Sequence, residues 1–349
     1  MITICLGLPG SGSTWLYNVV RTLIANSGTL AFEAENLPAI RDLLNHPTRN
    51  LLIKAHAIEH SFLYFSRAAN ARAIISSRDP KDGIASIMKR IQPNPYSAIP
   101  EVLRSFAATN SAHKMLPSCI FNYDSDFINK KETLYELLAF FGEEKSKSEI
   151  DNIFDLFTKE NVHNFVRKIK EQEFTAFDPF SGMAYDQVTM FNEHHLGDGR
   201  SGKWQDIHDS FVRNELEVIF GAAAGDRIQT GQTLRFSESI FSGSPEIYYP
   251  PIVGPGLQVL SRCYLPYGAW HIRLVGQLVE CAGAQFYLCH SGRIIASGTS
   301  DSRGDINLEF TYQNQAHDDH FSFHLGLDTT LALDPRREGR TTIIATYVG

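Results

Sequence analysis

The chain has 349 residues, of which 43% are hydrophobic and 20% charged, and its formal net charge at pH 7 is −7. This composition is typical of a globular protein with enough residues for one large domain or two smaller ones. The acidic balance argues against general binding to nucleic acid or to a membrane surface, although it is compatible with a local basic pocket. No apolar run is long enough to be expected to cross a bilayer.

The cysteines and the N-terminus bear on the compartment. The five cysteines are widely scattered and form no C-x-x-C pair, which favours reduced thiols. Met1 leads directly into an apolar run, without the basic segment that opens a secretory signal. We therefore expect a cytoplasmic protein, and the sequence leaves its oligomeric state open.

The first stretch, residues 2–16, combines an apolar run, a turn rich in Gly, Pro and Ser, and an apolar-periodic segment. It predicts a buried strand, a phosphate-binding loop and a helix, whose backbone N–H groups and positive end attract anions. Gly7 and Gly12 have the spacing of the Walker A motif, but Ser13 stands in the place of its lysine. Because that lysine meets the transferring phosphoryl group of a nucleotide kinase, we expect a phosphate ligand other than ATP.

Strand and helix patterns alternate through the first two-thirds of the chain. Strands are expected at 51–54, 71–76 and 118–123, and helices at 82–90, 134–141, 150–157, 162–169 and 211–220. This order predicts an α/β domain with a mainly parallel, doubly wound sheet and binding loops at the carboxyl ends of its strands. Residues 91–100 contain three prolines and predict an irregular loop.

The pattern changes near Phe241, where Gly, Ser and Pro residues predict turns. Short alternating runs follow, without lysine and without a helical period. They predict an all-β sandwich or jelly roll. The expected domains are therefore 1–242 and 243–349. The histidines between 317 and 324 are most simply a polar turn and a strand, and no metal is expected.

A Lys-Ala-His segment, residues 54–56, ends one of the predicted strands. At that edge of the sheet Lys54 and His56 can both face a pocket, where a neutral imidazole could deprotonate a hydroxyl. The alternative is a His56 that caps the strand and a solvated Lys54.

Two later segments offer further anion contacts. Arg78 follows a buried strand and Ser86 lies one turn into the next helix, so both can bind a phosphate. The alternative is a surface arginine paired with Asp79 or Asp82. Residues 197–205 combine glycines with two cations, which predicts either a flexible loop over an anionic ligand or an exposed turn.

In order and spacing, these segments resemble the sulfotransferase family that uses 3′-phosphoadenosine 5′-phosphosulfate (PAPS). Pro9-Gly10-Ser11-Gly12-Ser13-Thr14-Trp15-Leu16 is similar to its 5′-phosphosulfate loop, P-[KR]-S-G-[ST]-[ST]-W-L, and residues 54–56 are similar to its K-x-H segment. Arg78 and Ser86 match its 3′-phosphate signature, and residues 199–204 resemble its late G-x-x-G-x-W loop. The resemblance covers about residues 1–240.

The resemblance implies transfer of a sulfuryl group from PAPS to an acceptor hydroxyl, with His56 as general base and Lys54 as a second catalytic residue. With Gly10 in the loop, the backbone N–H groups, the helix dipole and Lys54 are expected to stabilise the transition state. The residues implied to bind the cofactor are Pro9, Gly10, Ser11, Gly12, Ser13, Thr14, Trp15, Arg78, Ser86, Arg200, Ser201, Gly202 and Lys203. Trp204 joins Trp15 as a candidate for the adenine slot. The appended β domain favours a carbohydrate or glycolipid acceptor by fold analogy, and a small-molecule alcohol is the alternative.

The chain departs from the family at Gly10, where a cation is usual. Loss of one donor to a transition state typically costs about 10²–10³ in rate. A catalytically weak nucleotide- or glycan-binding protein therefore stays open as an alternative. A P-loop-like kinase is the other alternative, although it would need a lysine near Ser13.

Overall fold

The structure is a computed structural model of the chain, and its contacts divide it into two compact units. One unit comprises Met1–Asn94 and Glu101–Asp206, and the other comprises Pro95–Pro100 and Ile207–Gly349. The structure describes all residues except 25–28, 42–49, 91–94, 178–182, 194–198, 225–228, 230–231, 241–246, 249–256, 260–267, 279–282, 284, 291–292, 315–323, 329–338 and 349.

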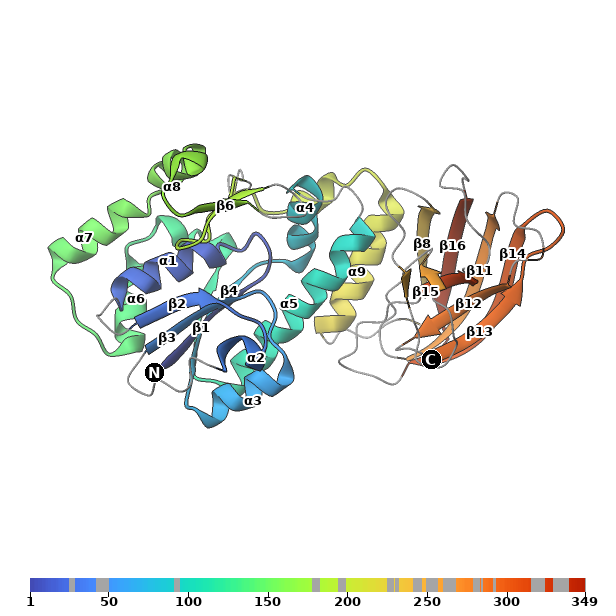
Figure 1. Ribbon diagram of the computed structural model, residues 1–349, viewed down its shortest axis with the longest axis horizontal. Helices are drawn as coiled ribbons and strands as arrows, with labels where there is room; N and C mark the ends of the chain where they lie inside the picture. The colour runs from blue at the N-terminus through green and yellow to red at the C-terminus, as the bar shows by residue number, and fades with distance from the viewer. Residues whose placement is uncertain are drawn as a thin grey trace. The chain divides into compact units, whose positions relative to one another are not determined.

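The first unit is built on a five-stranded sheet in the order β2-β3-β1-β4-β5, in which every neighbouring pair is parallel (Figure 1). Its strands are β1 (Ile2–Gly7), β2 (Thr29–Glu33), β3 (Asn50–Ala55), β4 (Arg72–Ser77) and β5 (Ser118–Asn122). The predicted α/β class and parallel sheet are confirmed. Because β1 lies between β3 and β4, the loop that leaves β1 opens at the middle of the sheet.

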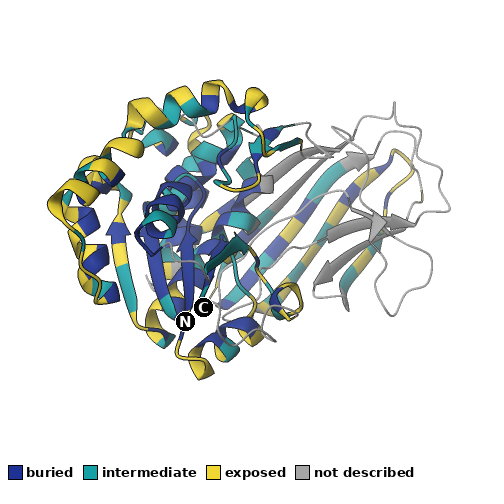
Figure 2. Ribbon diagram, turned by 60° about the vertical axis from the view of Figure 1, so that its left-hand side comes forward, coloured by how far each residue is buried: buried dark blue, intermediate teal, exposed yellow. Residues whose placement is uncertain are grey.

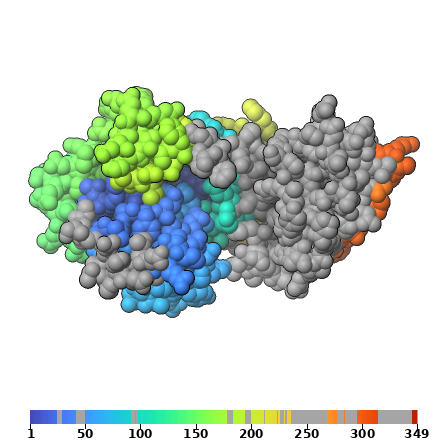
Figure 3. Space-filling view, in the orientation of Figure 1, coloured from blue at the N-terminus to red at the C-terminus, as the bar shows by residue number. Residues whose placement is uncertain are grey.

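Eight helices carry residues of this unit. They are α1 (Ser13–Leu23), α2 (Leu37–Ile40), α3 (His60–Ala68), α4 (Pro80–Arg90), α5 (Pro95–Met115), α6 (Glu132–Phe141), α7 (Lys147–Leu156) and α8 (Lys159–Arg167) among the described residues. Two short antiparallel strands, β6 (Thr175–Phe177) and β7 (Ala184–Asp186), follow α8. In the space-filling view the yellow-green residues around α8 lie against the blue N-terminal part of the chain (Figure 3).

The central strands bury both of their faces. In β1, Cys5 packs into a core with residues of α1, α6 and α7, whereas Ile4 and Leu6 pack into another core with residues of α2 and α3. Side chains of a strand alternate between the two faces of a sheet, so each face carries its own helices. The buried strands in the middle and the exposed outer faces of the helices can be followed in Figure 2.

The prediction of an irregular loop over residues 91–100 is wrong for its second half. Pro95–Pro100 form the beginning of α5, and residues 91–94 lie outside the described residues. Pro95 is the first residue of α5, a position where the missing N–H of a proline has no partner in any case. The three prolines within these ten residues therefore concealed the start of a long helix.

The second unit contains α9 (Ser210–Ala224) and two antiparallel sheets, in the orders β13-β12-β15-β10-β9 and β14-β11-β16-β8. The strands are β8 (Thr233–Ile240), β9 (Ile247–Tyr248), β10 (Leu257–Val259), β11 (Gly268–Leu278), β12 (Gln285–His290), β13 (Arg293–Thr299), β14 (Asp305–Asn314), β15 (His324–Asp328) and β16 (Gly339–Tyr347). In β11, Trp270, Ile272 and Leu274 are buried while Arg273 is exposed, as the alternating sequence predicts.

The antiparallel character of the C-terminal region is confirmed, and its arrangement as a sandwich or jelly roll stays a prediction. β8 pairs with β16, so this sheet begins before the domain boundary predicted at residue 242. Of the turn-forming residues that suggested the boundary, 242–245 stand between β8 and β9 in the sequence and 250–256 between β9 and β10, and both groups lie outside the described residues. His317 and His320 lie outside the described residues.

Candidate active site

The chain turns from β1 into α1 through residues 9–14, called the anion loop below, which are held by hydrogen bonds within the loop. The backbone N–H of Ser11 donates to the carbonyl of Leu8 at 3.0 Å, and its hydroxyl donates to the same oxygen at 2.7 Å. Gly10 and Gly12 have φ values of 74° and 82°, where glycine is favoured. Gly12 is the N-cap of α1, without a side-chain cap and without an acidic residue in the first turn. The positive end of the helix is therefore left to an anion.

A cavity of about 1050 Å³ opens over this loop. Most of the residues expected from the sequence line it, namely Pro9, Gly10, Gly12, Ser13, Thr14, Trp15, Lys54, His56, Arg78, Ser86, Ser201 and Lys203. Ser11 is buried and hydrogen-bonded to Leu8 and Ser76, so it shapes the loop. Arg200 and Gly202 bond through their backbones to Arg78 and Asp82. Segments from several strand ends thus converge on one cavity.

His56 is held at the edge of the anion loop. Its Nδ1 lies 2.7 Å from the carbonyl oxygen of Gly7, and its Nε2 lies 3.3 Å from the Nζ of Lys54. A carbonyl can only accept, so Nδ1 carries the proton, and Nε2 accepts from the ammonium. Burial and the charge of Lys54 lower the pKa of His56 to about 3. The imidazole is therefore neutral at neutral pH, as a general base requires.

Lys54 is not solvated, contrary to the alternative reading of the sequence. Its side chain is 5% exposed, and its Nζ lies 2.9 Å from Oε1 of Glu33. Glu33 lines the cavity and pairs with Lys54 in the register of β2 and β3. Sequence reasoning missed Glu33 because β2 was not predicted, and the contact depends on strand pairing.

Arg78 is a buried cation that joins three parts of the site. Its Nη1 donates to the carbonyl of Gly10 at 2.8 Å, and its Nη2 donates to Asp82 at 3.2 Å and to the carbonyl of Arg200 at 3.1 Å. The guanidinium also lies over the ring of Tyr123, 4.7 Å from its centroid. Pairing with Asp82 was one of the alternatives, but the pair is buried, with both side chains 1% exposed.

Asp82 anchors residues 199–204, called the late loop below, to α4. Its carboxylate accepts the backbone N–H of Gly202 at 2.8 Å and that of Trp204 at 3.2 Å. Farther out, Arg200 pairs with the exposed Asp206, while the hydroxyl of Ser201 bonds to Asp124. The sequence placed Asp82 only as a possible ion partner. Asp82 lies in the first turn of α4, whereas Arg78 lies between β4 and that helix.

Ser86 and the two tryptophans complete the predicted set. A Cβ built on Gly10 would lie 2.6 Å from Oγ of Ser86, so these residues are in close contact. Trp15 lines the cavity, and its indole N–H donates to the carbonyl of Phe157 at 2.7 Å. Trp204 is buried, with the Nζ of Lys81 4.1 Å from the centroid of its ring. Of the two, Trp15 is the one that contributes to the wall of the cavity.

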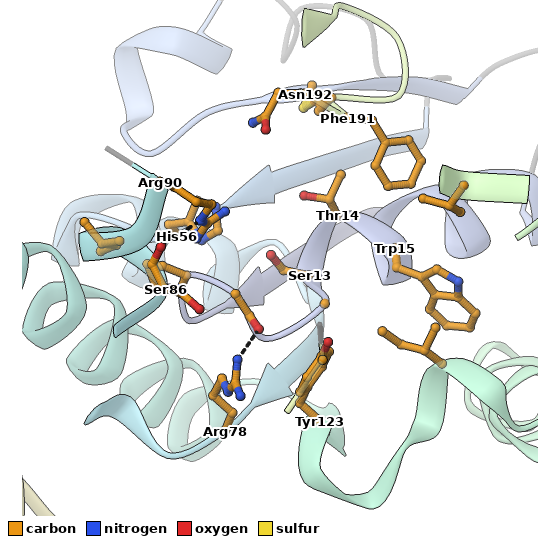
Figure 4. Close-up of a pocket in the computed structure, with 18 of the residues that line it drawn as sticks. Ser13, Thr14, Trp15, His56, Arg78, Ser86, Arg90, Tyr123, Phe191 and Asn192 are labelled. Carbon is orange, nitrogen blue, oxygen red and sulfur yellow. Dashed lines mark hydrogen bonds between the residues drawn. The ribbon is translucent and has the colours of Figure 1, made fainter. Parts of the chain in front are cut away.

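Arg90, at the end of α4, is a cavity residue that sequence reasoning missed. Its Nε donates to the carbonyl of Ser86 at 3.1 Å. In Figure 4 the side chains of Arg90 and His56 are drawn at the same side of the cavity, and the charge of Arg90 helps to lower the pKa of His56. Its spacing of four residues from Ser86 puts both on one side of the helix, which was the signal available in the sequence.

Within the described ranges, no cluster of three or more His, Cys, Asp or Glu side chains is placed to hold a metal ion. His194 and His195 fall outside those ranges. The helices seen in the described part of the chain are also too short or too polar to pass through a membrane.

The sequence matches no family model and no curated protein. Among solved structures, mouse sulfotransferase SULT7A1 complexed with PAP is 16% identical over 63% of this chain and 83% of its own, with a TM-score of 0.45. Retinol dehydratase in complex with androsterone and the inactive cofactor PAP is 12% identical over 65% and 82%, with a TM-score of 0.42. PRD1 vertex protein P5 is 10% identical over 35% and 100%, with a TM-score of 0.22. Likeness at this level assigns neither family nor function.

Proposed function

We propose that this protein is a PAPS-dependent sulfotransferase that transfers a sulfuryl group to an acceptor hydroxyl. The observation that carries the proposal is the hydrogen bond of 2.7 Å between His56 and Gly7. Gly7 is the last residue of β1 before the anion loop, so a neutral imidazole base stands at the edge of a phosphate-type site.

The residues of the cavity fit such a nucleotide. The uncapped N-terminus of α1 and the N–H groups of the Gly10–Thr14 loop suit the 5′-phosphosulfate. Ser86 and Arg78 both lie close to Gly10 and suit the 3′-phosphate. The Nε of Arg78 is a buried donor without a partner among the described residues, which is the kind of group that a bound anion satisfies.

In the proposed reaction the acceptor oxygen attacks sulfur and forms the new O–S bond. The bond from sulfur to the bridging phosphate oxygen breaks, and its electron pair stays with the phosphate. His56 takes the acceptor proton at Nε2, while its Nδ1–H stays on Gly7 and fixes the ring. Lys54 must move its ammonium from Nε2 as the acceptor enters, and Glu33 holds it nearby.

The acceptor side of the proposal rests on analogy. We propose a carbohydrate or glycolipid hydroxyl, because β modules appended to enzymes frequently bind sugars. We also propose that the protein acts in the cytoplasm. Neither proposal is needed for the chemistry at His56.

The test begins with calorimetric titration of 3′-phosphoadenosine 5′-phosphate (PAP) and, separately, ATP. We expect tight binding of PAP and little binding of ATP, because Ser13 replaces the lysine that a kinase needs. Preference for ATP, or binding of neither by folded protein, would reject the proposal. PAP release from PAPS is then followed with a panel of sugars, glycolipids and small alcohols, with His56→Ala as the inactive variant.

A second candidate, a catalytically weak nucleotide- or glycan-binding protein, is favoured by one observation. The ammonium of Lys54 donates to Nε2 of His56 at 3.3 Å and so occupies the lone pair that a base would need. A binding protein would bind PAP yet show no PAPS turnover with any acceptor, and His56→Ala would change nothing. An enzyme loses turnover in His56→Ala while it keeps its affinity for PAP.

A further inference from the structure

Sulfuryl transfer is helped by a cationic side chain close to the transferred group. The anion loop has no such side chain. As the bond from sulfur to the bridging oxygen breaks, negative charge develops on that oxygen, next to the sulfuryl oxygens, and preorganised donors act most strongly at such a centre. The segment Pro9–Thr14 contains neither Lys nor Arg. Gly10 cannot simply be replaced by a cation, because its φ is +74° and a Cβ would lie 2.6 Å from Ser86 Oγ. The cation must therefore come from another element.

Two buried cations of the cavity are already committed to groups of the protein. Lys54 is paired with the carboxylate of Glu33 at 2.9 Å. Arg78 directs Nη1 to Gly10 and Nη2 to Asp82 and Arg200, and the Nε that it leaves without a partner among the described residues is the donor proposed above for the 3′-phosphate. Both cations hold the walls of the site together.

Arg90 differs from these two in its hydrogen bonding. Its Nε is fixed on the carbonyl of Ser86 at 3.1 Å. Among the described residues its two Nη groups have no hydrogen-bond partner, although the side chain is partly buried and lines the cavity. With Nε held there, the guanidinium lies on the same side of the cavity as His56 (Figure 4). Its charge also contributes to the lowered pKa of His56, which agrees with a short separation.

We propose that Arg90 is the catalytic cation of this site and donates from its Nη groups to the sulfuryl oxygens during transfer. The inference rests on the proposed sulfotransferase function. An arginine suits the role because its fork of donors matches two oxygens of one group and it stays protonated even when partly buried. The sulfuryl group is the part of PAPS that PAP lacks, so Arg90 distinguishes the two nucleotides.

The test compares Arg90→Gln with Arg90→Lys and with Arg104→Gln as a matched control. Arg104 is an exposed arginine on α5, and like Arg90 it acts electrostatically on Glu101. The affinities for PAPS and PAP are measured by calorimetry without acceptor, and kcat is measured with acceptor present. We expect Arg90→Gln to lower kcat by about 10²-fold and to weaken PAPS more than PAP, with partial recovery in Arg90→Lys and no change in Arg104→Gln.

The outcomes separate the two proposals. If the wild-type protein binds neither nucleotide, the sulfotransferase proposal and the role of Arg90 both fall. If the wild type binds PAPS and PAP but Arg90→Gln weakens both equally, Arg90 acts on the nucleotide or on the fold and its proposed role is overturned. A change in the acceptor KM alone overturns it too, because Arg90 then contacts the acceptor.

Discussion

The buried pair of Arg78 and Asp82 is predicted to hold the late loop over the cavity, and Asp82→Asn tests this. Asp82 neutralises Arg78 and accepts the N–H groups of Gly202 and Trp204. Asparagine has nearly the same shape but no charge, and it offers one acceptor oxygen where the carboxylate has two. The substitution therefore leaves the Arg78 guanidinium buried without a counter-ion.

The expected loss is large because both side chains are only 1% exposed. Removal of one partner from a buried ion pair costs about 3–5 kcal/mol, since the other charge stays buried and unpaired. The matched control is Asp206→Asn. Its pair with Arg200 lies in the same segment but is 55% and 59% exposed, and an exposed pair contributes about 0–1 kcal/mol.

Two measurements check this. Urea unfolding gives the change in free energy of unfolding, and hydrogen exchange of the amides of Gly202 and Trp204 reports the loop directly. We expect Asp82→Asn to lose several kcal/mol and to exchange faster at both amides, while Asp206→Asn stays close to wild type. Equal effects of the two variants, or unchanged exchange at Gly202 in Asp82→Asn, would refute the reasoning.

Three further predictions follow from single positions. Gly10→Ala should weaken PAP binding without unfolding the protein, because the new Cβ would lie 2.6 Å from Ser86 Oγ and a φ of +74° disfavours alanine. Calorimetry measures the affinity, and an unchanged affinity would contradict the prediction. The pKa of His56 lies at about 3, below its usual value, so the base stays neutral on acidification and its acid limb in a profile of kcat/KM against pH should lie well below 6.5. A limb at 6.5 would contradict this. The same shift also affects stability: because the unfolded chain binds this proton near 6.5 and the folded protein only near 3, stability that is present above pH 6.5 is lost as the pH falls towards 3. Trp270→Ala should cost about 3–5 kcal/mol in the C-terminal unit, because this side chain is fully buried against Tyr347, and a melt unchanged by the substitution would contradict it.

The parts of the fold that could be predicted from the sequence are those determined by residues close together in the chain. The buried run at β1, the glycines after it and the periodic segment of α1 specify strand, loop and helix in succession. The start of α5 could not be predicted, because the same prolines are compatible with a helix N-terminus and with a loop. The contact of Glu33 with Lys54 depends on the pairing of β2 and β3, which a single sequence does not state.

The candidate site shows the same division. His56 and Ser86 could be proposed from the sequence because they belong to short motifs, whereas the residues around them could not be predicted. Whether Arg78 lies at the surface or in a buried pair depends on the late loop, which is more than a hundred residues away and bonds to Arg78 through the carbonyl of Arg200. Such long-range contacts decide which cations can still bind a ligand.

The distribution of positive charge in the cavity offers a physical reason for the glycine at position 10. Arg78 donates to the carbonyl of Gly10 at 2.8 Å, and Ser86 packs directly against that glycine. A side chain at this position would separate them and disturb the link between the loop and α4. The helix that packs there also carries Arg90 one turn farther along, with Nε fixed on Ser86. Close packing of α4 against the loop thus excludes a cation from the loop and, through Arg90, provides one from the helix.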